Sequence, residues 1–280
     1  MPMAIVGAAP MLARHESLGM NAMSEVVELS RENDLAFVTL NRPDKLNALD
    51  KGMWQRLAAV MGEVAADGAV RCVVVRGNGP AFGAGADIAE FASERGTPAA
   101  AEAYAEIMGE ALEAMRACPV PTVAQIHGAC AGAGLEIAIH CDIRLAAAGS
   151  RFGIPIQRLG VGLPYPELAA LAELVGAATA LEILLEGRMF DAAEAREKGL
   201  VTRVVADDRL VEETLAAARR IADGAPLSHR WHKRAVRRLL DPRPLSADEL
   251  REGYAICGSE DYRDGVAAFL AKSRSAFRGR

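Results

Sequence analysis

Two glycine-rich stretches decide the fold: Gly79-Pro80-Ala81-Phe82-Gly83-Ala84-Gly85-Ala86-Asp87-Ile88 and His127-Gly128-Ala129-Cys130-Ala131-Gly132-Ala133-Gly134-Leu135-Glu136. Each follows a short apolar run that predicts a buried strand, at 72–75 and 122–126, and each leads toward a helix. Glycine lets another group approach the chain closely, and the start of a helix presents unpaired N–H groups. Two such loops converging on one oxygen atom would form an oxyanion hole of backbone donors.

Composition narrows the class of protein. The 280 residues allow one large domain or two modest ones, and 51% of them are hydrophobic. A net charge of −5 argues weakly against nucleic acid as the main partner. The five cysteines form no C-x-x-C pair, which favours a reducing compartment with no disulfide framework and no metal site. No apolar run reaches the ~18–20 residues of a membrane span, so we expect a soluble protein.

Hydrophobic periodicity predicts alternating strands and helices. A strand–helix order implies parallel pairing with right-handed crossovers, and the pattern after residue 165 is mostly helical. No linker separates a second independent domain. The expected elements are hairpin strands at 25–29 and 35–40, a helix after the N-cap Asp50, a strand at 71–76, a helix at 99–117, strands at 122–126 and 143–146, a helix beginning at 191 and a strand at 201–205.

Five motifs, in order over about residues 24–278, resemble the crotonase superfamily, the enoyl-CoA hydratase/isomerase family. They are Asn41-Arg42-Pro43-x-Lys45-x-Asn47-Ala48-Leu49, the first glycine-rich loop, the second glycine-rich loop together with Cys141-Asp142-Ile143-Arg144, Gly199-Leu200-Val201 and the run 259–270. The resemblance implies an α/β fold, a superhelix of β-β-α units with a C-terminal helical region. It also implies a homotrimer or a dimer of trimers.

The same resemblance suggests how the chain is divided. The apolar run at the start of the chain is broken by prolines and charged residues, so we expect residues 1–23 to be a disordered N-terminal extension. The resemblance implies that residues 24–215 form the spiral core with the acyl-CoA site. Residues 216–280 form the C-terminal helices, which serve oligomerisation and complete the coenzyme A pocket.

The resemblance also assigns site residues for an acyl-CoA thioester. Its carbonyl oxygen is expected between the backbone N–H groups of Ala86 and Ala133. No separate cofactor is implied, because coenzyme A is part of the substrate. The positions expected along coenzyme A are Lys45, Leu46, Ala48, Ala84, Asp87, Ile88 and Gly132.

Hydratases of the family use two glutamates to activate the water that they add. The first matches Glu136, but Ile156 stands at the position of the second. An apolar residue there removes a proton-transfer partner, typically worth 10²–10⁴-fold in rate. Tyr165 and Glu167, just beyond it, are candidate replacements, and a surface turn is the competing interpretation.

Each of three other sequence features allows two interpretations. Asp87 suits either a helix N-cap or a polar contact to substrate. Cys130 near His127 suits either a packed thiol or a nucleophile. The basic run 229–239 suits an amphipathic helix with Val236 and Leu239 inward, or a face that binds RNA.

The sequence therefore predicts a cytoplasmic acyl-CoA enzyme that stabilises a thioester enolate, best assigned as an enoyl-CoA hydratase of fatty-acid or related acyl-CoA catabolism. The alternative, motivated by Ile156, is an isomerase, decarboxylase or hydrolase of acyl-CoA. A non-catalytic module that binds acyl-CoA or RNA is the alternative from a different class.

Overall fold

A six-stranded sheet forms the centre of the protein, as seen in a computed structural model that describes residues 25–280. The extension predicted for 1–23 lies outside these residues. Strands β1 and β2 pair antiparallel, and all other neighbours in the order β1-β2-β3-β4-β6-β9 are parallel, as predicted. The strands are β1 (Val27–Glu32), β2 (Leu35–Leu40), β3 (Cys72–Gly77), β4 (Thr122–Ile126), β6 (Ile143–Ala147) and β9 (Arg203–Val205).

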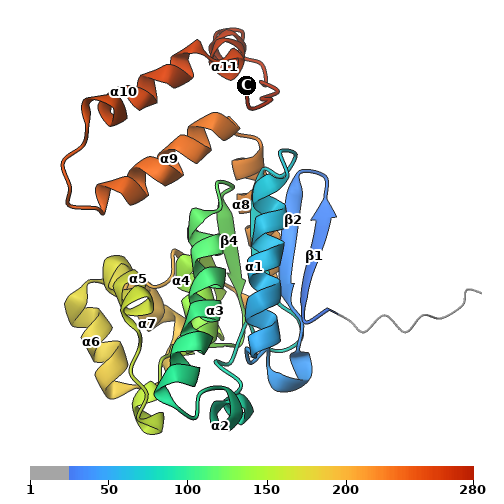
Figure 1. Ribbon diagram of the computed structural model, residues 1–280. Helices are drawn as coiled ribbons and strands as arrows, with labels where there is room; N and C mark the ends of the chain where they lie inside the picture. The colour runs from blue at the N-terminus through green and yellow to red at the C-terminus, as the bar shows by residue number, and fades with distance from the viewer. Residues whose placement is uncertain (1–24) are drawn as a thin grey trace, which may run out of the picture.

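Helices cover both faces of this sheet (Figure 1). Helices α1 (Lys51–Ala66) and α3 (Pro98–Ala117) lie side by side on one face, and α8 (Leu210–Ala222) packs on the other. Alternation along β3 explains the two layers, because Val73 and Val75 join the larger core while Cys72 and Val74 join the core beneath α8.

Helix α1 has the N-cap and the apolar stripe that the sequence predicts. It begins after Asp50, whose carboxylate accepts a hydrogen bond from the Met53 N–H at 2.8 Å. The predicted apolar stripe is fully buried: Met53, Trp54, Leu57, Val60, Met61 and Val64.

A second, three-stranded sheet was not predicted. It consists of β5 (Ala129–Ala131), β7 (Arg151–Gly153) and β8 (Phe190–Asp191), in that order. Such short strands carry too few residues for a visible alternation. The remaining helices of the main body are α2 (Phe91–Glu94), α4 (Ala133–His140), α5 (Tyr165–Val175), α6 (Ala177–Glu186) and α7 (Ala192–Glu197).

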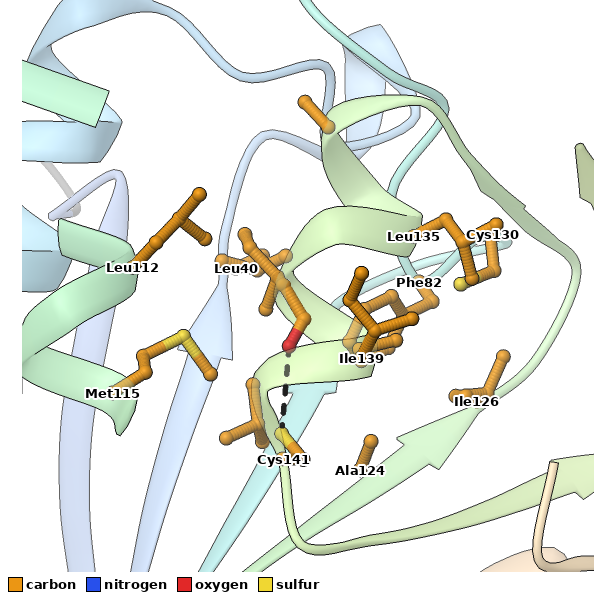
Figure 2. Packing of buried hydrophobic residues seen from close by; sticks show 14 of the residues in the cluster. Leu40, Phe82, Leu112, Met115, Ala124, Ile126, Cys130, Leu135, Ile139 and Cys141 are labelled. Carbon is orange, nitrogen blue, oxygen red and sulfur yellow. Dashed lines mark hydrogen bonds between the residues drawn. The ribbon is translucent and has the colours of Figure 1, made fainter. Parts of the chain in front are cut away.

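Helix α4 lies in the core, which fixes the position of its first turn. Figure 2 shows Leu135 and Ile139 of α4 among Phe82, Cys130 and other buried side chains. The Cys141 thiol at its end donates to the Ile137 carbonyl at 3.7 Å.

Three helices, α9 (Pro226–Leu239), α10 (Ala247–Ala255) and α11 (Glu260–Leu270), extend from one end of the body (Figure 1). The prediction that Val236 and Leu239 face inward is wrong, since they are 61% and 66% exposed. No helix in the range 25–280 has both the length and the apolar character that crossing a membrane requires.

Charge explains the orientation of α9. Lys233 Nζ lies 2.7 Å from an Asp142 carboxylate oxygen, and an Arg237 nitrogen lies 2.9 Å from the other. Lys233 also donates to the Val120 carbonyl at 2.8 Å, and the Thr122 N–H donates to Asp142 at 2.8 Å. The cations of the basic run thus attach α9 to the body, and this favours the structural interpretation of that run.

Candidate active site

The two glycine-rich loops lie directly against each other. The Gly83 N–H donates to the Ala129 carbonyl at 3.0 Å, and the Ala131 N–H donates to the Gly83 carbonyl at 2.9 Å. A Cβ on Gly134 would lie 2.2 Å from the Gly83 carbonyl oxygen, so only glycine permits this approach. Segments about 50 residues apart in sequence are thereby held at one place.

Both predicted oxyanion donors line a cavity of about 480 Å³. The residues beside Ala86 bond away from it, because the Asp87 N–H donates to the Leu49 carbonyl at 2.8 Å and the Leu49 N–H to Gly85 at 2.8 Å. Ala133 is the first residue of α4, where an N–H has no intrahelical partner. Within residues 25–280 neither N–H has an acceptor, as an oxyanion hole requires.

Arg42 and Asn47 hold the early loop against the first glycine-rich loop. Buried Asn47 donates through Nδ2 to the carbonyls of Asn78 at 2.9 Å and Ala81 at 2.8 Å. Arg42 bridges Asp50 and Asp87, each at 2.9 Å. The motif containing these two residues was recognised in the sequence, but its role as a cross-link depends on long-range contacts.

Asp87 acts as a cap. Its carboxylate accepts from the Ala89 N–H at 3.2 Å, at the start of a 3-10 turn (Ile88–Glu90). The hydrogen bond from Arg42 is the main reason that the pKa of Asp87 is lowered. Of the two interpretations of Asp87, the structure shows capping.

Some of the other residues predicted along coenzyme A line the cavity, and the rest lie outside its wall. Ala84, Ile88 and Gly132 line the cavity. Lys45 and Leu46 are exposed beside it, with the Leu46 carbonyl accepting from the Ala84 N–H at 3.0 Å. The Ala48 carbonyl accepts from Arg42 at 2.8 Å. This arrangement gives an exposed edge next to the cavity mouth, and coenzyme A binding there stays a prediction.

Glu136 lies on the cavity wall in the first turn of α4. Its side chain is buried, and Oε2 has no hydrogen-bond partner among the described residues. Burial raises the pKa of Glu136 to about 7, with a further increase from Glu167 and an opposing effect of Arg95. A carboxyl group with a pKa near 7 exchanges protons readily in both directions at neutral pH.

The rest of the cavity wall is mainly apolar, and Ile156 is part of it. In the described part of the chain, Glu136 is the sole carboxylate on this wall, and Arg95 and Arg158 are the cations. Apolar members include Phe91, Met108, Ile156, Leu159, Val161 and Leu163.

The two candidate replacements for the second glutamate differ in position. Glu167, in the first turn of α5, is buried with Oε2 unpartnered, and burial raises its pKa. It is near enough to affect Glu136 but does not line the cavity. The structure does not bring Tyr165 to the cavity, because its side chain is 88% exposed on the outer surface.

Cys130 and His127 do not form a nucleophilic pair. Cys130 is fully buried, and burial raises its pKa well above the usual thiol value, so it stays protonated. The ring Nε2 of His127 lies 2.7 Å from the Gly79 carbonyl oxygen. No cluster of His, Cys, Asp and Glu side chains in the range 25–280 could hold a metal ion.

Comparison with known proteins gives a consistent match. The enoyl-CoA hydratase/isomerase family matches residues 30–280. A probable enoyl-CoA hydratase of Rhizobium meliloti is 36% identical over 91% of this chain and 99% of its own length. The 2,3-dehydroadipyl-CoA hydratase of Escherichia coli is 31% identical over 92% of this chain and 100% of its own length.

Solved structures agree with this match. A crystal structure of an enoyl-CoA hydratase/carnithine racemase from Magnetospirillum magneticum superposes with a TM-score of 0.90 at 49% identity, covering 91% of this chain and 96% of that one. The predicted crotonase-type α/β fold is therefore confirmed. This chain belongs to the enoyl-CoA hydratase/isomerase family.

Proposed function

We propose that this protein is an enoyl-CoA hydratase-like lyase of acyl-CoA catabolism that works through a thioester enolate. One observation carries the proposal. The unpaired N–H groups of Ala86 and Ala133 and the buried carboxyl group of Glu136 share one largely apolar cavity.

The two N–H groups supply the electrostatic part of the mechanism. When a nucleophile adds to an enoyl thioester, negative charge moves onto the thioester oxygen. Donors already in position stabilise that charge without reorganisation, and losing one such donor typically costs ~3–4 kcal/mol of transition-state stabilisation.

Glu136 transfers the proton, first as a general base and then as a general acid. As a carboxylate it removes a proton from water while the water oxygen bonds to Cβ of the substrate, and the enolate forms. As a carboxylic acid it then returns that proton to Cα, so one group acts as base and acid in turn. A pKa of about 7 makes both forms available near neutral pH.

Double-bond isomerisation is a second candidate, favoured by Ile156 on the cavity wall. A 1,3-proton shift needs a single carboxylate, which takes a proton from one carbon and returns it to another. Hydration normally uses two, and the second position here is apolar. Among residues 25–280, no contact favours decarboxylation or thioester hydrolysis.

Absorbance of the enoyl thioester separates the two candidates. Loss of the crotonyl-CoA chromophore in water, abolished in Glu136→Gln, supports the hydratase. Conversion of a 3-enoyl-CoA to the conjugated 2-enoyl-CoA, with crotonyl-CoA unchanged, supports the isomerase. If neither substrate turns over although coenzyme A thioesters bind, the enzymatic proposal fails and an acyl-CoA-binding module remains.

The proposal extends to location and assembly. We place the enzyme in the cytoplasm, with the acyl-CoA thioester as its small-molecule partner and no separate cofactor. Residues 216–280 would mediate a homotrimer or a dimer of trimers, and the exposed apolar side chains of α9, α10 and α11 support this.

A further inference from the structure

We propose that Arg95 binds a carboxylate at the far end of the acyl group, so that the substrates are coenzyme A thioesters of dicarboxylic acids. This inference rests on the proposed function, because it takes the cavity of Glu136 as the acyl site. It adds a subsite and a class of substrate to that function.

Arg95 is a cation without a partner on the cavity wall. It directly follows α2, and it forms no ion pair with any carboxylate in the range 25–280. Its Nε atom is buried and unsatisfied. A buried donor without an acceptor is unfavourable, so this N–H group would gain from an acceptor on a ligand.

Two aromatic rings fix the orientation of this guanidinium. Its central carbon lies 3.7 Å from the ring centroid of Tyr104 and 4.6 Å from that of Phe91. Stacking of this kind holds the plane of the guanidinium and leaves its edge for hydrogen bonds. An arginine edge pairs with a carboxylate through two parallel bonds, which makes a carboxylate the expected ligand.

The two acids that precede Arg95 closely in sequence, Glu90 and Glu94, are engaged elsewhere. The Glu94 carboxylate pairs with Lys51 at 3.0 Å. Glu90 accepts hydrogen bonds from the Lys51 N–H at 2.9 Å and from the Tyr104 hydroxyl at 3.3 Å. With these contacts, neither carboxylate forms an ion pair with Arg95, although both precede it closely in sequence.

The surroundings indicate which part of a substrate Arg95 meets. The thioester oxygen has its own donors at Ala86 and Ala133, on other elements. The wall around Arg95 includes Ala101, Ala105 and Met108 of α3, which suit methylene groups. Arg158 is the other cation of the cavity, but it is exposed, so solvent screens its charge.

The test is calorimetric binding of matched thioesters to the full-length protein. Succinyl-, glutaryl- and adipyl-CoA are compared with butyryl-, valeryl- and hexanoyl-CoA, which have the same chain lengths without the second carboxylate. We expect one diacid to bind roughly 10- to 100-fold more tightly than its neutral counterpart, the usual effect of a charged hydrogen-bonded pair. Arg95→Met should remove this preference, so that the diacid binds no more tightly than its neutral counterpart.

Arg76→Met is the matched control. The Arg76 guanidinium also stacks on an aromatic ring, 4.9 Å from the centroid of Phe37, but it does not line the cavity. This variant should keep the preference for the diacid.

Three results overturn the proposal. The first is equal binding of both series by the wild type, and the second is a diacid preference that persists in Arg95→Met. Equal weakening of both series in Arg95→Met would instead assign Arg95 to coenzyme A or to Glu136. Binding needs no turnover, so a diacid preference in a protein that turns over no thioester would uphold the subsite and reject the proposed reaction.

Discussion

At the scale of single residues, the chemistry depends on a carboxyl group kept out of water. Glu136 is placed by the first turn of α4, and the burial that raises its pKa comes from the cavity wall around it. Glu167 adds a second buried carboxyl group nearby, and Ile156 supplies apolar surface. Burial and Glu167 raise the pKa of Glu136, and Arg95 opposes them, so these surroundings determine when Glu136 carries a charge.

The pH dependence of kcat/KM tests this directly. Only the ionised form of Glu136 removes a proton, so kcat/KM should rise about tenfold per pH unit below the pKa. It should level off above a midpoint of about 7. Glu167→Gln removes a neighbouring negative charge, so it should move the midpoint to lower pH. A wild-type midpoint near 4.5, the usual value for Glu, would contradict this assignment.

Only some of the residues on the cavity wall could be predicted from the sequence. Ala86, Ala133 and Glu136 lie on one cavity, as the two loops suggested. Arg95 was not recognised, because no local pattern shows that an arginine lacks a partner. Tyr165 was a poor candidate because exposure of the first helical residue depends on the packing of α5, which local sequence does not encode.

At the scale of elements, the close contact of the two loops is the feature that positions the donors. Gly134→Ala would place a Cβ 2.2 Å from the Gly83 carbonyl oxygen, which must force the loops apart. We expect turnover to fall at least about 100-fold, the usual effect of losing an oxyanion donor, together with a lower unfolding temperature.

Gly62→Ala in α1 is the control for that variant. Nothing lies within 4 Å of a Cβ at Gly62, so alanine should stabilise the protein by about 0.4–1 kcal/mol with activity unchanged. Wild-type turnover in Gly134→Ala would show that the loops tolerate separation.

The attachment of α9 is a second test at this scale. Asp142→Ala would leave Lys233, whose side chain is 8% exposed, without its partner. Removing one member of a buried pair is expected to lower the free energy of unfolding by about 3 kcal/mol, measured by urea titration. Arg230→Met, on the same helix, removes a cation that forms no ion pair within residues 25–280 and should change it by less than about 0.5 kcal/mol. If both variants lowered the free energy of unfolding by the same amount, the ion pairs of Asp142 would not be what attaches α9 to the body.

Helices and strands could be predicted where the hydrophobic pattern runs over several residues of one element. The stripe of α1 has six buried residues, and the alternation along β3 matches two packing layers. The strands β5, β7 and β8 have only two or three residues each. In α9 the apolar periodicity was misleading, because the ion pairs to Asp142 turn Val236 and Leu239 outward.

At the scale of the whole molecule, a two-faced sheet carries the site while three helices extend from one end (Figure 1). Large apolar side chains remain exposed on these helices, among them Tyr254, Phe269 and Leu270. A monomer rarely leaves so many together in contact with water.

Sedimentation should therefore give the mass of a trimer or a hexamer. Replacing Phe269 and Leu270 with aspartate should shift the protein toward monomer, because charge is costly in an apolar interface. Val211→Glu, at an exposed apolar position on α8, should leave the mass unchanged. A monomeric wild type at micromolar concentration would contradict the proposed assembly.

The central claim is that Glu136 moves the proton of an enolate whose oxygen is held by the two loops. Transfer of deuterium from D₂O to Cα of hexanoyl-CoA or adipyl-CoA, followed by mass spectrometry, measures that step whichever net reaction follows. The wild type should exchange Cα hydrogens, and Glu136→Gln should do so about 10²–10⁴-fold more slowly. Exchange in Glu136→Gln at the wild-type rate would contradict the claim.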